Sequence, residues 1–188
     1  LDRNRRDYDK AIPSYEKKRI DGRGGKFWSW RKELRDAAVH PRLWPLLYFK
    51  RRLYARYRAL TTPAADIRSP HVVFFMHYQP ERTSMPEGKL YAQQWLVIRS
   101  LSLMLPSDYV LLVKEHPSTF MGAYERAYRN PRTYTDIASL ANVRLVSVAE
   151  DTFDLIDHAV AVATITGTVG LQALIRGVPV MTFGHASY

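Results

Sequence analysis

The residues best suited to chemistry follow short apolar runs, at five places along the second half of the chain. In chain order they are Gln79 and Glu81, then Lys114, Glu115, His116 and Pro117, then Glu150 and Asp151, then Thr166, Gly167 and Thr168, and finally Gly184 and His185. If each apolar run is a strand of one parallel sheet, these groups meet at its carboxyl edge, where open α/β sheets bind ligands. Amides, hydroxyls, imidazoles and an ammonium together suit an anionic ligand.

The turn Thr166-Gly167-Thr168 separates an apolar run from a helical pattern. Such a turn places hydroxyls and backbone N–H groups at a helix N-terminus, where free donors and the helix dipole favour an anion. We therefore predict anion binding at this turn. The alternative is that Thr166 or Thr168 serves only as the helix N-cap.

His116 is the most informative single residue, because Pro117 follows it. Proline fixes its own φ and biases the preceding residue towards extended geometry, so the imidazole is aimed. An imidazole can donate to a phosphate oxygen and can carry charge near neutral pH. The alternative is a histidine that only caps its loop.

Glu81 is the best-placed carboxylate, beside Pro80. It could act as a general base, a nucleophile or an acceptor for a sugar hydroxyl, or it could be a solvated loop residue. His77 falls within the first predicted strand and is interpreted as a core histidine. The chain has no Walker A loop, GxGxxG, HExxH or GxSxG, so P-loop kinases, dehydrogenases with the usual fingerprint, zincins and α/β-hydrolases lack their marks.

Strand and helix patterns alternate from residue 71 onwards. Predicted strands cover residues 71–78, 108–114, 143–147, 159–165 and 180–183, and predicted helices cover 89–105, 134–140, 152–158 and 169–176. Gly177 and Pro179 mark the end of the last helix. The alternation predicts an α/β fold with a parallel, doubly wound, Rossmann-like sheet.

Composition sets the wider limits. The 188 residues are 46% hydrophobic and include no cysteine, so a core is expected and disulfides are excluded. No apolar run approaches the roughly 20 residues that span a bilayer, and no signal peptide is recognised, so we expect a cytoplasmic protein. The chain ends just after a strand without a covering helix, as expected for a fragment of a longer protein.

The net charge of +10 is concentrated in the first third of the chain. Residues 1–60 hold 18 Lys and Arg against 7 Asp and Glu, whereas residues 61–188 hold 10 against 11. We therefore divide the chain into a basic arm with helices (1–60), a linker (61–70) and an α/β domain (71–188).

A helix predicted over residues 43–60 has an apolar side, interrupted by Lys50, with Arg51, Arg52, Arg56 and Arg58 off that side. Contact with an anionic membrane surface, through residues 27–60 as a whole, is one interpretation. The other is a helix that packs on a domain outside this chain and keeps its charges in water. No RNA- or DNA-binding motif accompanies the helix, so nucleic acid is not an expected partner.

Four segments resemble the bacterial capsule polysaccharide biosynthesis family, which includes the β-Kdo transferases: FFMHYQPERTSMPEG, LLVKEHPS, NVRLVS and ATITGTVGLQALIRGVPVMTFG. The resemblance covers about residues 68–188. It implies the second, donor-binding half of a GT-B glycosyltransferase. It also implies that His116 with Thr166 and Thr168 holds the donor phosphate, and that Glu81 matches an acidic residue near the reacting sugar.

The expected function is transfer of a sugar, with Kdo from CMP-Kdo favoured, to a lipid-linked glycan by an enzyme peripheral to the inner membrane. The alternatives are a CDP-glycerol-type phosphotransferase and a non-catalytic nucleotide- or glycan-binding module. Apart from the donor substrate, no cofactor and no metal are expected. The predicted catalytic residues are Glu81 and His116, and the predicted donor-binding residues are Gln79, Lys114, His116, Pro117, Thr166, Gly167 and Thr168.

Overall fold

A parallel five-stranded sheet forms the centre of the molecule, in the order β3-β2-β1-β4-β5. The computed structural model describes residues 38, 40–79, 88–120 and 129–186. The strands are β1 (His71–Phe75), β2 (Val110–Lys114), β3 (Val143–Val146), β4 (Ala161–Thr164) and β5 (Val180–Thr182). Val72 of β1 lies opposite Leu111 of β2 on one side and Ala161 of β4 on the other. The predicted parallel, Rossmann-like α/β sheet is confirmed.

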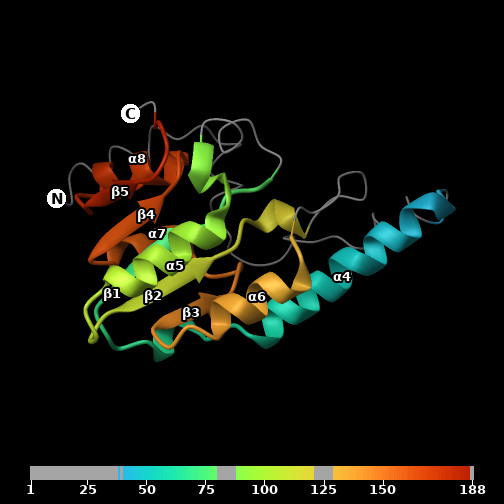
Figure 1. Cartoon of the computed structure of the whole chain (residues 1–188), viewed down its shortest axis with the longest axis horizontal. Coiled ribbons are helices and arrows are strands. Elements are labelled where there is room, and N and C mark those ends of the chain that lie inside the picture. The colour runs from blue at the N-terminus through green and yellow to red at the C-terminus, as the bar shows by residue number, and fades with distance from the viewer. Residues whose placement is uncertain (1–37, 39, 80–87, 121–128, 187–188) are drawn as a thin grey trace.

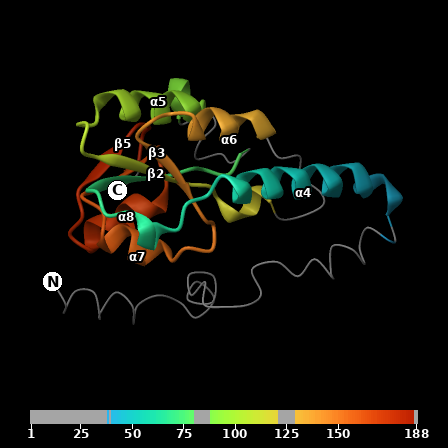
Figure 2. The same ribbon diagram turned by 90° about the horizontal axis from the view of Figure 1, so that it is seen from below.

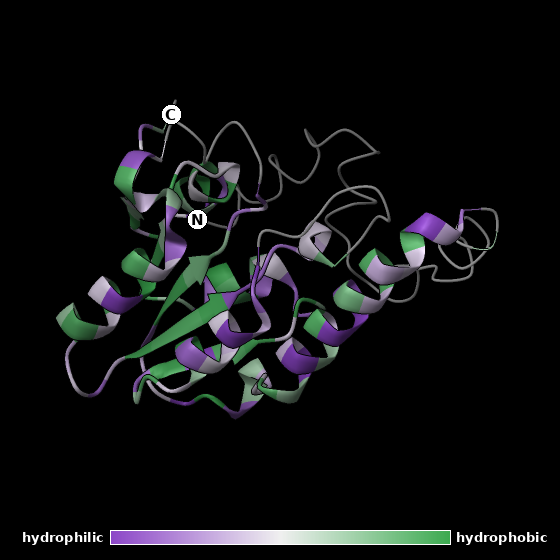
Figure 3. Ribbon diagram, turned by 45° about the vertical axis from the view of Figure 1, so that its right-hand side comes forward, coloured by the Kyte–Doolittle hydropathy of each residue, from purple (hydrophilic) through white to green (hydrophobic). Residues whose placement is uncertain are grey.

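Helices cover both faces of this sheet (Figures 1 and 2). The α-helices are α4 (Trp44–Ala59), α5 (Gln94–Met104), α6 (Pro131–Ala138), α7 (Thr152–Asp157) and α8 (Thr168–Ile175), with short 3₁₀ turns at Pro41–Leu43, Ala64–Asp66, Lys89–Ala92 and Pro117–Thr119. One core joins α4, α5 and α6 to alternate residues of the strands, such as Val72 and Phe74. The other core joins α7 and α8 to the intervening strand residues, such as Val73, which point to the opposite face of the sheet. Both faces are therefore buried, which explains why the strands are coloured as hydrophobic in Figure 3.

Several element ends differ from the predicted ones for local reasons. α6 begins three residues earlier than predicted, because the Asn130 side chain caps it by accepting from the Arg132 N–H at 2.9 Å, with Pro131 in the first turn. β1 ends at Phe75, so His77 lies beyond the strand rather than inside it. The end of α8 matches the prediction: Gly177 has φ 78°, and its N–H donates to the Leu174 carbonyl.

The basic helix α4 packs only part of its length on the domain, and its N-terminal end projects beyond the sheet (Figure 1). Its buried residues, Leu47, Lys50, Leu53 and Tyr57, recur at helical spacing on one side. Lys50 interrupts the apolar side in the sequence, yet it is buried with that side. Within the described ranges, no helix combines the length and apolarity needed to cross a membrane.

The segment predicted as a linker, residues 61–70, packs against the sheet. Thr61 forms a parallel bridge with Leu145, and the Thr62 N–H donates to the Leu145 carbonyl at 2.8 Å. The Ala64 N–H also donates to the Glu150 carboxylate at 3.3 Å. This segment therefore covers the outer edge of β3 and ties α4 to the domain.

Candidate functional site at the carboxyl edge of the sheet

Because all five strands are parallel, the residues that follow them lie along one edge of the sheet. The strand order places the end of β1 between the ends of β2 and β4. The predicted positions after β2, at His116, and after β4, at Thr166, are therefore two strand spacings apart, on the order of 10 Å. Glu81 lies outside the described residues.

Glu115 is the central buried polar residue at this edge, and 1% of it is exposed. Its Oε1 accepts hydrogen bonds from the His116 N–H at 2.8 Å and the Thr119 hydroxyl at 3.2 Å. Its Oε2 accepts from Arg129 Nε and from the Tyr134 hydroxyl, both at 2.8 Å. Both carboxylate oxygens are thus occupied, as a charge in this position requires.

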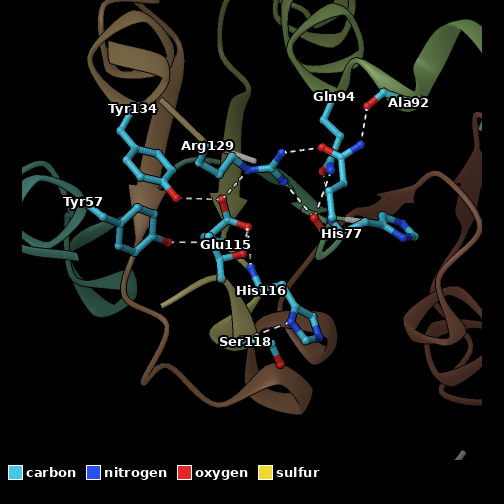
Figure 4. Close-up of polar contacts among 11 residues, drawn as sticks. Tyr57, His77, Ala92, Gln94, Glu115, His116, Ser118, Arg129 and Tyr134 are labelled. Carbon is cyan, nitrogen blue, oxygen red and sulfur yellow. Dashed lines mark hydrogen bonds and ion pairs between the residues drawn. The ribbon is translucent and has the colours of Figure 1, made fainter. Parts of the chain in front are cut away.

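Arg129 carries the matching charge and connects two strand ends (Figure 4). Its Nη1 donates to the Gln79 side-chain oxygen and its Nη2 to the His77 carbonyl, each at 2.7 Å. Burial alone would lower the pKa of Arg129, but the Glu115 carboxylate beside it raises that pKa above its usual value. One guanidinium therefore fixes the chain after β1 against the chain after β2.

Two tyrosines close the network from the helices. Tyr57 of α4 donates to the Val146 carbonyl and accepts from the Glu115 N–H at 3.1 Å. Burial, together with the Glu115 carboxylate, raises the pKa of Tyr134, and burial also raises the pKa of Tyr57. Both phenols therefore remain protonated donors. The hydroxyl of Tyr57 connects α4 to the site, and that of Tyr134 connects α6.

His77 occupies the position between the two predicted phosphate-binding elements. Its Nε2 lies 3.0 Å from the Thr164 hydroxyl, and the N–H groups of Ile165 and Thr166 donate to it at 3.2 and 3.4 Å. Burial, together with the nearby His116 and Arg129, lowers the pKa of His77 to about 4. The ring is therefore neutral near pH 7, and it contacts the turn rather than only filling the core.

The turn after β4 leads into α8 as predicted, but the N-cap alternative is wrong. The N-cap of α8 is Gly167, and no side chain caps the helix, so neither Thr166 nor Thr168 is the N-cap. The N–H groups of residues 165–167 point to His77 Nε2 and the Thr164 hydroxyl. Among the described residues, the N–H groups of Thr168 and Val169 have no acceptor, so these two remain for an anion.

Gly167 is required by the close approach of this turn to His77. A Cβ at position 167 would lie 2.9 Å from the Thr164 hydroxyl oxygen and 3.1 Å from Cε1 of His77. A side chain there would push the turn away from the ring. The glycine thus keeps the N-terminus of α8 next to the end of β1.

His116 has the extended backbone that Pro117 favours, with φ −72° and ψ 127°. Its Nδ1 accepts from the Ser118 N–H at 3.2 Å, so the ring proton of the neutral form is on Nε2. The imidazole does cap its loop, as the alternative interpretation held. The ring lies beside that of Tyr78, with 6.0 Å between the centroids.

Lys114 and Gln79 lie at the predicted edge, with their polar atoms bonded to the protein. The Lys114 ammonium donates to the Glu150 carbonyl at 2.6 Å and to the Thr152 hydroxyl at 2.9 Å. Burial lowers its pKa to about 8, although Asp151 and Glu150 act in the opposite direction. The Gln79 amide accepts from Arg129 and donates to the Ala92 carbonyl at 2.7 Å. Their predicted contact with a nucleotide stays a prediction.

Sequence reasoning placed Glu115 at the ligand edge without giving it a role, missed Arg129 and Tyr134, and assigned His77 to the core. Glu115 adjoins the singled-out His116, and its position at a strand end was a usable signal. Arg129 and Tyr134 follow no strand, so no motif marked them. In the described part of the chain, no group of three or more His, Cys, Asp or Glu residues could hold a metal ion.

The fold and the edge define the class: a Rossmann-like α/β domain with an anion-compatible edge at the carboxyl ends of its strands. The chain belongs to the capsule polysaccharide biosynthesis protein family, whose model matches residues 92–188. No curated protein sequence matches the chain.

Solved structures similar to the chain include the following three. The β-Kdo 2,7 transferase of KpsC from Thermosulfurimonas dismutans matches 76% of this chain with a TM-score of 0.50 and 18% identity. The β-Kdo 2,4 transferase of the same KpsC matches 77% (TM-score 0.45, 15% identity), covering 46% of that chain. UDP-GlcNAc 2-epimerase of Methanocaldococcus jannaschii, in complex with UDP-GlcNAc and UDP, matches 74% (TM-score 0.38, 13% identity), covering 35% of that chain. The chain spans 43% of the 2,7 transferase, and that match shows a shared fold.

Proposed function

We propose that the protein is a glycosyltransferase of capsule polysaccharide synthesis that takes its sugar from a nucleotide-sugar donor, with CMP-Kdo favoured, and passes it to a lipid-linked glycan. In this proposal the chain supplies the donor-binding half of a GT-B enzyme. Membership of the capsule family supports the biological setting. The observation that carries the proposal is the pairing, along one edge, of a loop-anchored imidazole after β2 with two N–H groups at the start of α8 after β4.

The chemistry required of this edge is stabilisation of the departing nucleotide phosphate, on which negative charge grows in the transition state. The Nε2–H of His116 would approach the phosphate from the β2 side. The N–H groups of Thr168 and Val169, with the helix dipole behind them, would approach from the β4 side. Glu81, by the family resemblance, would act near the reacting sugar.

Titration with nucleotides tests the proposal directly. We expect the protein to bind CMP more tightly than UDP or CDP in calorimetry, and the intact enzyme to transfer Kdo from CMP-Kdo. Preference for CDP with transfer of glycerol phosphate would indicate the phosphotransferase instead. Binding of CMP without any turnover would indicate a non-catalytic module, and no nucleotide binding at all would contradict the proposal.

We further propose that α4 contacts the anionic surface of the inner membrane, where a lipid-linked acceptor lies. Arg51, Arg52, Arg56 and Arg58 are all exposed, and Arg56 also donates to the Thr135 hydroxyl of α6 through Nε and Nη2. Exposed aromatic rings of Trp44 and Tyr48 lie on the same helix. Basic and aromatic side chains on one helix suit a headgroup layer.

Replacing Arg51, Arg52 and Arg58 with Gln together is expected to weaken binding to anionic vesicles about 100-fold, since each basic residue near such a surface contributes about 1 kcal/mol. Co-sedimentation with vesicles of mixed phosphatidylglycerol and phosphatidylethanolamine measures this, and binding should fall as salt rises. The matched control neutralises three exposed basic residues elsewhere, Arg68, Lys89 and Arg99. Equal losses in the two triple variants would contradict a role specific to α4.

A further inference from the structure

We propose that His77 is a positioning residue: its neutral imidazole holds the turn before α8 so that the first two N–H groups of that helix face the donor phosphate. This inference rests on the proposed function. It adds a residue that no motif singles out, and a role that the ring performs through the turn rather than by touching the substrate.

The ring acts as an acceptor at a point where the turn has several donors. Three groups converge on Nε2, namely the Thr164 hydroxyl at 3.0 Å and the N–H groups of Ile165 and Thr166 at 3.2 and 3.4 Å. Backbone N–H groups only donate, so Nε2 carries no proton and the ring proton lies on Nδ1. A positively charged ring could not accept these bonds, and burial together with neighbouring charge keeps the pKa of His77 near 4.

The backbone of His77 is itself fixed on both sides. The Gln94 side chain accepts from the His77 N–H at 2.8 Å and donates to its carbonyl at 2.9 Å. Arg129 donates to the same carbonyl at 2.7 Å. Figure 4 shows the imidazole pointing away from Glu115 while its main chain stays in the network. The ring is therefore held rigidly against the turn.

This arrangement determines which donors are left for a ligand. The Thr164 hydroxyl, which bonds His77, also accepts from the Gly167 N–H at 3.2 Å. With residues 165–167 satisfied in this way, the next two N–H groups, at Thr168 and Val169, begin the helix without an acceptor among the described residues. Loss of the His77 acceptor would free the earlier N–H groups and allow the turn to rotate.

Two similar substitutions separate this role from general packing. In His77→Gln the side-chain oxygen can reach the position of Nε2, whereas in His77→Asn it reaches only the position of Nδ1. We expect H77Q to bind CMP within about threefold of the wild type, and H77N to bind about tenfold more weakly, the effect of losing one hydrogen bond. Amide hydrogen exchange at Ile165 and Thr166 should accelerate in H77N and not in H77Q.

A variant on the other side of the contact gives an independent check. Thr164→Val removes the hydroxyl with little change of shape, and CMP binding should again weaken about tenfold while the domain stays folded. Asn142→Ala is the control. Asn142 directly precedes β3, at the amino ends of the strands, and exchanges hydrogen bonds with Ser102 of α5 there. That variant should bind CMP like the wild type.

The outcomes distinguish this inference from the proposed function. If the wild type binds no nucleotide, the proposed function fails, and the exchange rates still decide whether His77 holds the turn. The positioning role is wrong if the wild type binds CMP and folded H77Q and H77N bind it equally well or equally poorly. It is also wrong if the exchange rates of Ile165 and Thr166 do not change in H77N.

Discussion

Replacing Arg129 with methionine is expected to lower the free energy of unfolding by about 3 to 5 kcal/mol, the usual cost of removing one partner of a buried ion pair. The substitution leaves the Glu115 carboxylate, 1% exposed, without its counter-charge. It also removes the donors that hold the Gln79 side chain and the His77 carbonyl. Urea unfolding followed by circular dichroism measures the loss.

The double variant Glu115→Gln with Arg129→Met provides the matched comparison. Removing both charges should recover part of the stability, because the uncompensated charge causes much of the single variant's loss. Arg56→Met is the surface control: this arginine bonds Thr135 across α4 and α6 in an exposed position and should cost about 1 kcal/mol or less. An R129M variant as stable as R56M would show that the network is not a structural centre.

Replacing His116 with alanine is expected to lower turnover by about 100-fold, which corresponds to about 3 kcal/mol for one donor aimed at developing charge. Nucleotide affinity should fall as well, while the unfolding transition should change little because the side chain is only partly buried. Val162→Asp, which puts a carboxylate into a fully buried strand position, should instead unfold the domain.

His116→Asn separates loop capping from phosphate binding. An asparagine oxygen can replace Nδ1 as the acceptor for the Ser118 N–H, so the loop keeps its cap. The Nε2–H donor, however, is lost. We therefore expect H116N to be as defective as H116A in turnover. Wild-type turnover in H116N would show that His116 serves only its loop.

The sheet could be predicted because its strands read as short apolar runs between polar breaks, and the three central ones, β1, β2 and β4, are buried on both faces. The end of α8 could be predicted equally well from Gly177, because this residue adopts a positive φ that glycine tolerates best. The start of α6 was placed late because helical apolar spacing begins only at Tyr134, whereas the helix itself starts beside the Asn130 cap.

The site was only partly predictable, since its contacts depend on strand order rather than on spacing along the chain. Nothing local shows that β1 lies between β2 and β4, so His77 could not be recognised as the neighbour of the turn. Glu115 and Arg129 meet across 14 positions through a buried ion pair that no motif encodes. The polar residues after the strands correctly indicated the carboxyl edge of the sheet. Which of their hydrogen-bond donors remain for a ligand depends on the contacts that the fold makes between them.

The most direct test of the central claim is a CMP titration followed through the backbone amide signals of the protein. We predict that CMP shifts the signals of Thr168 and Val169 together with the imidazole signals of His116, in a single saturable transition, and leaves residues at the opposite edge, such as Asn142, unchanged. Saturable CMP binding that shifts neither Thr168 nor Val169 would contradict a phosphate site at the start of α8.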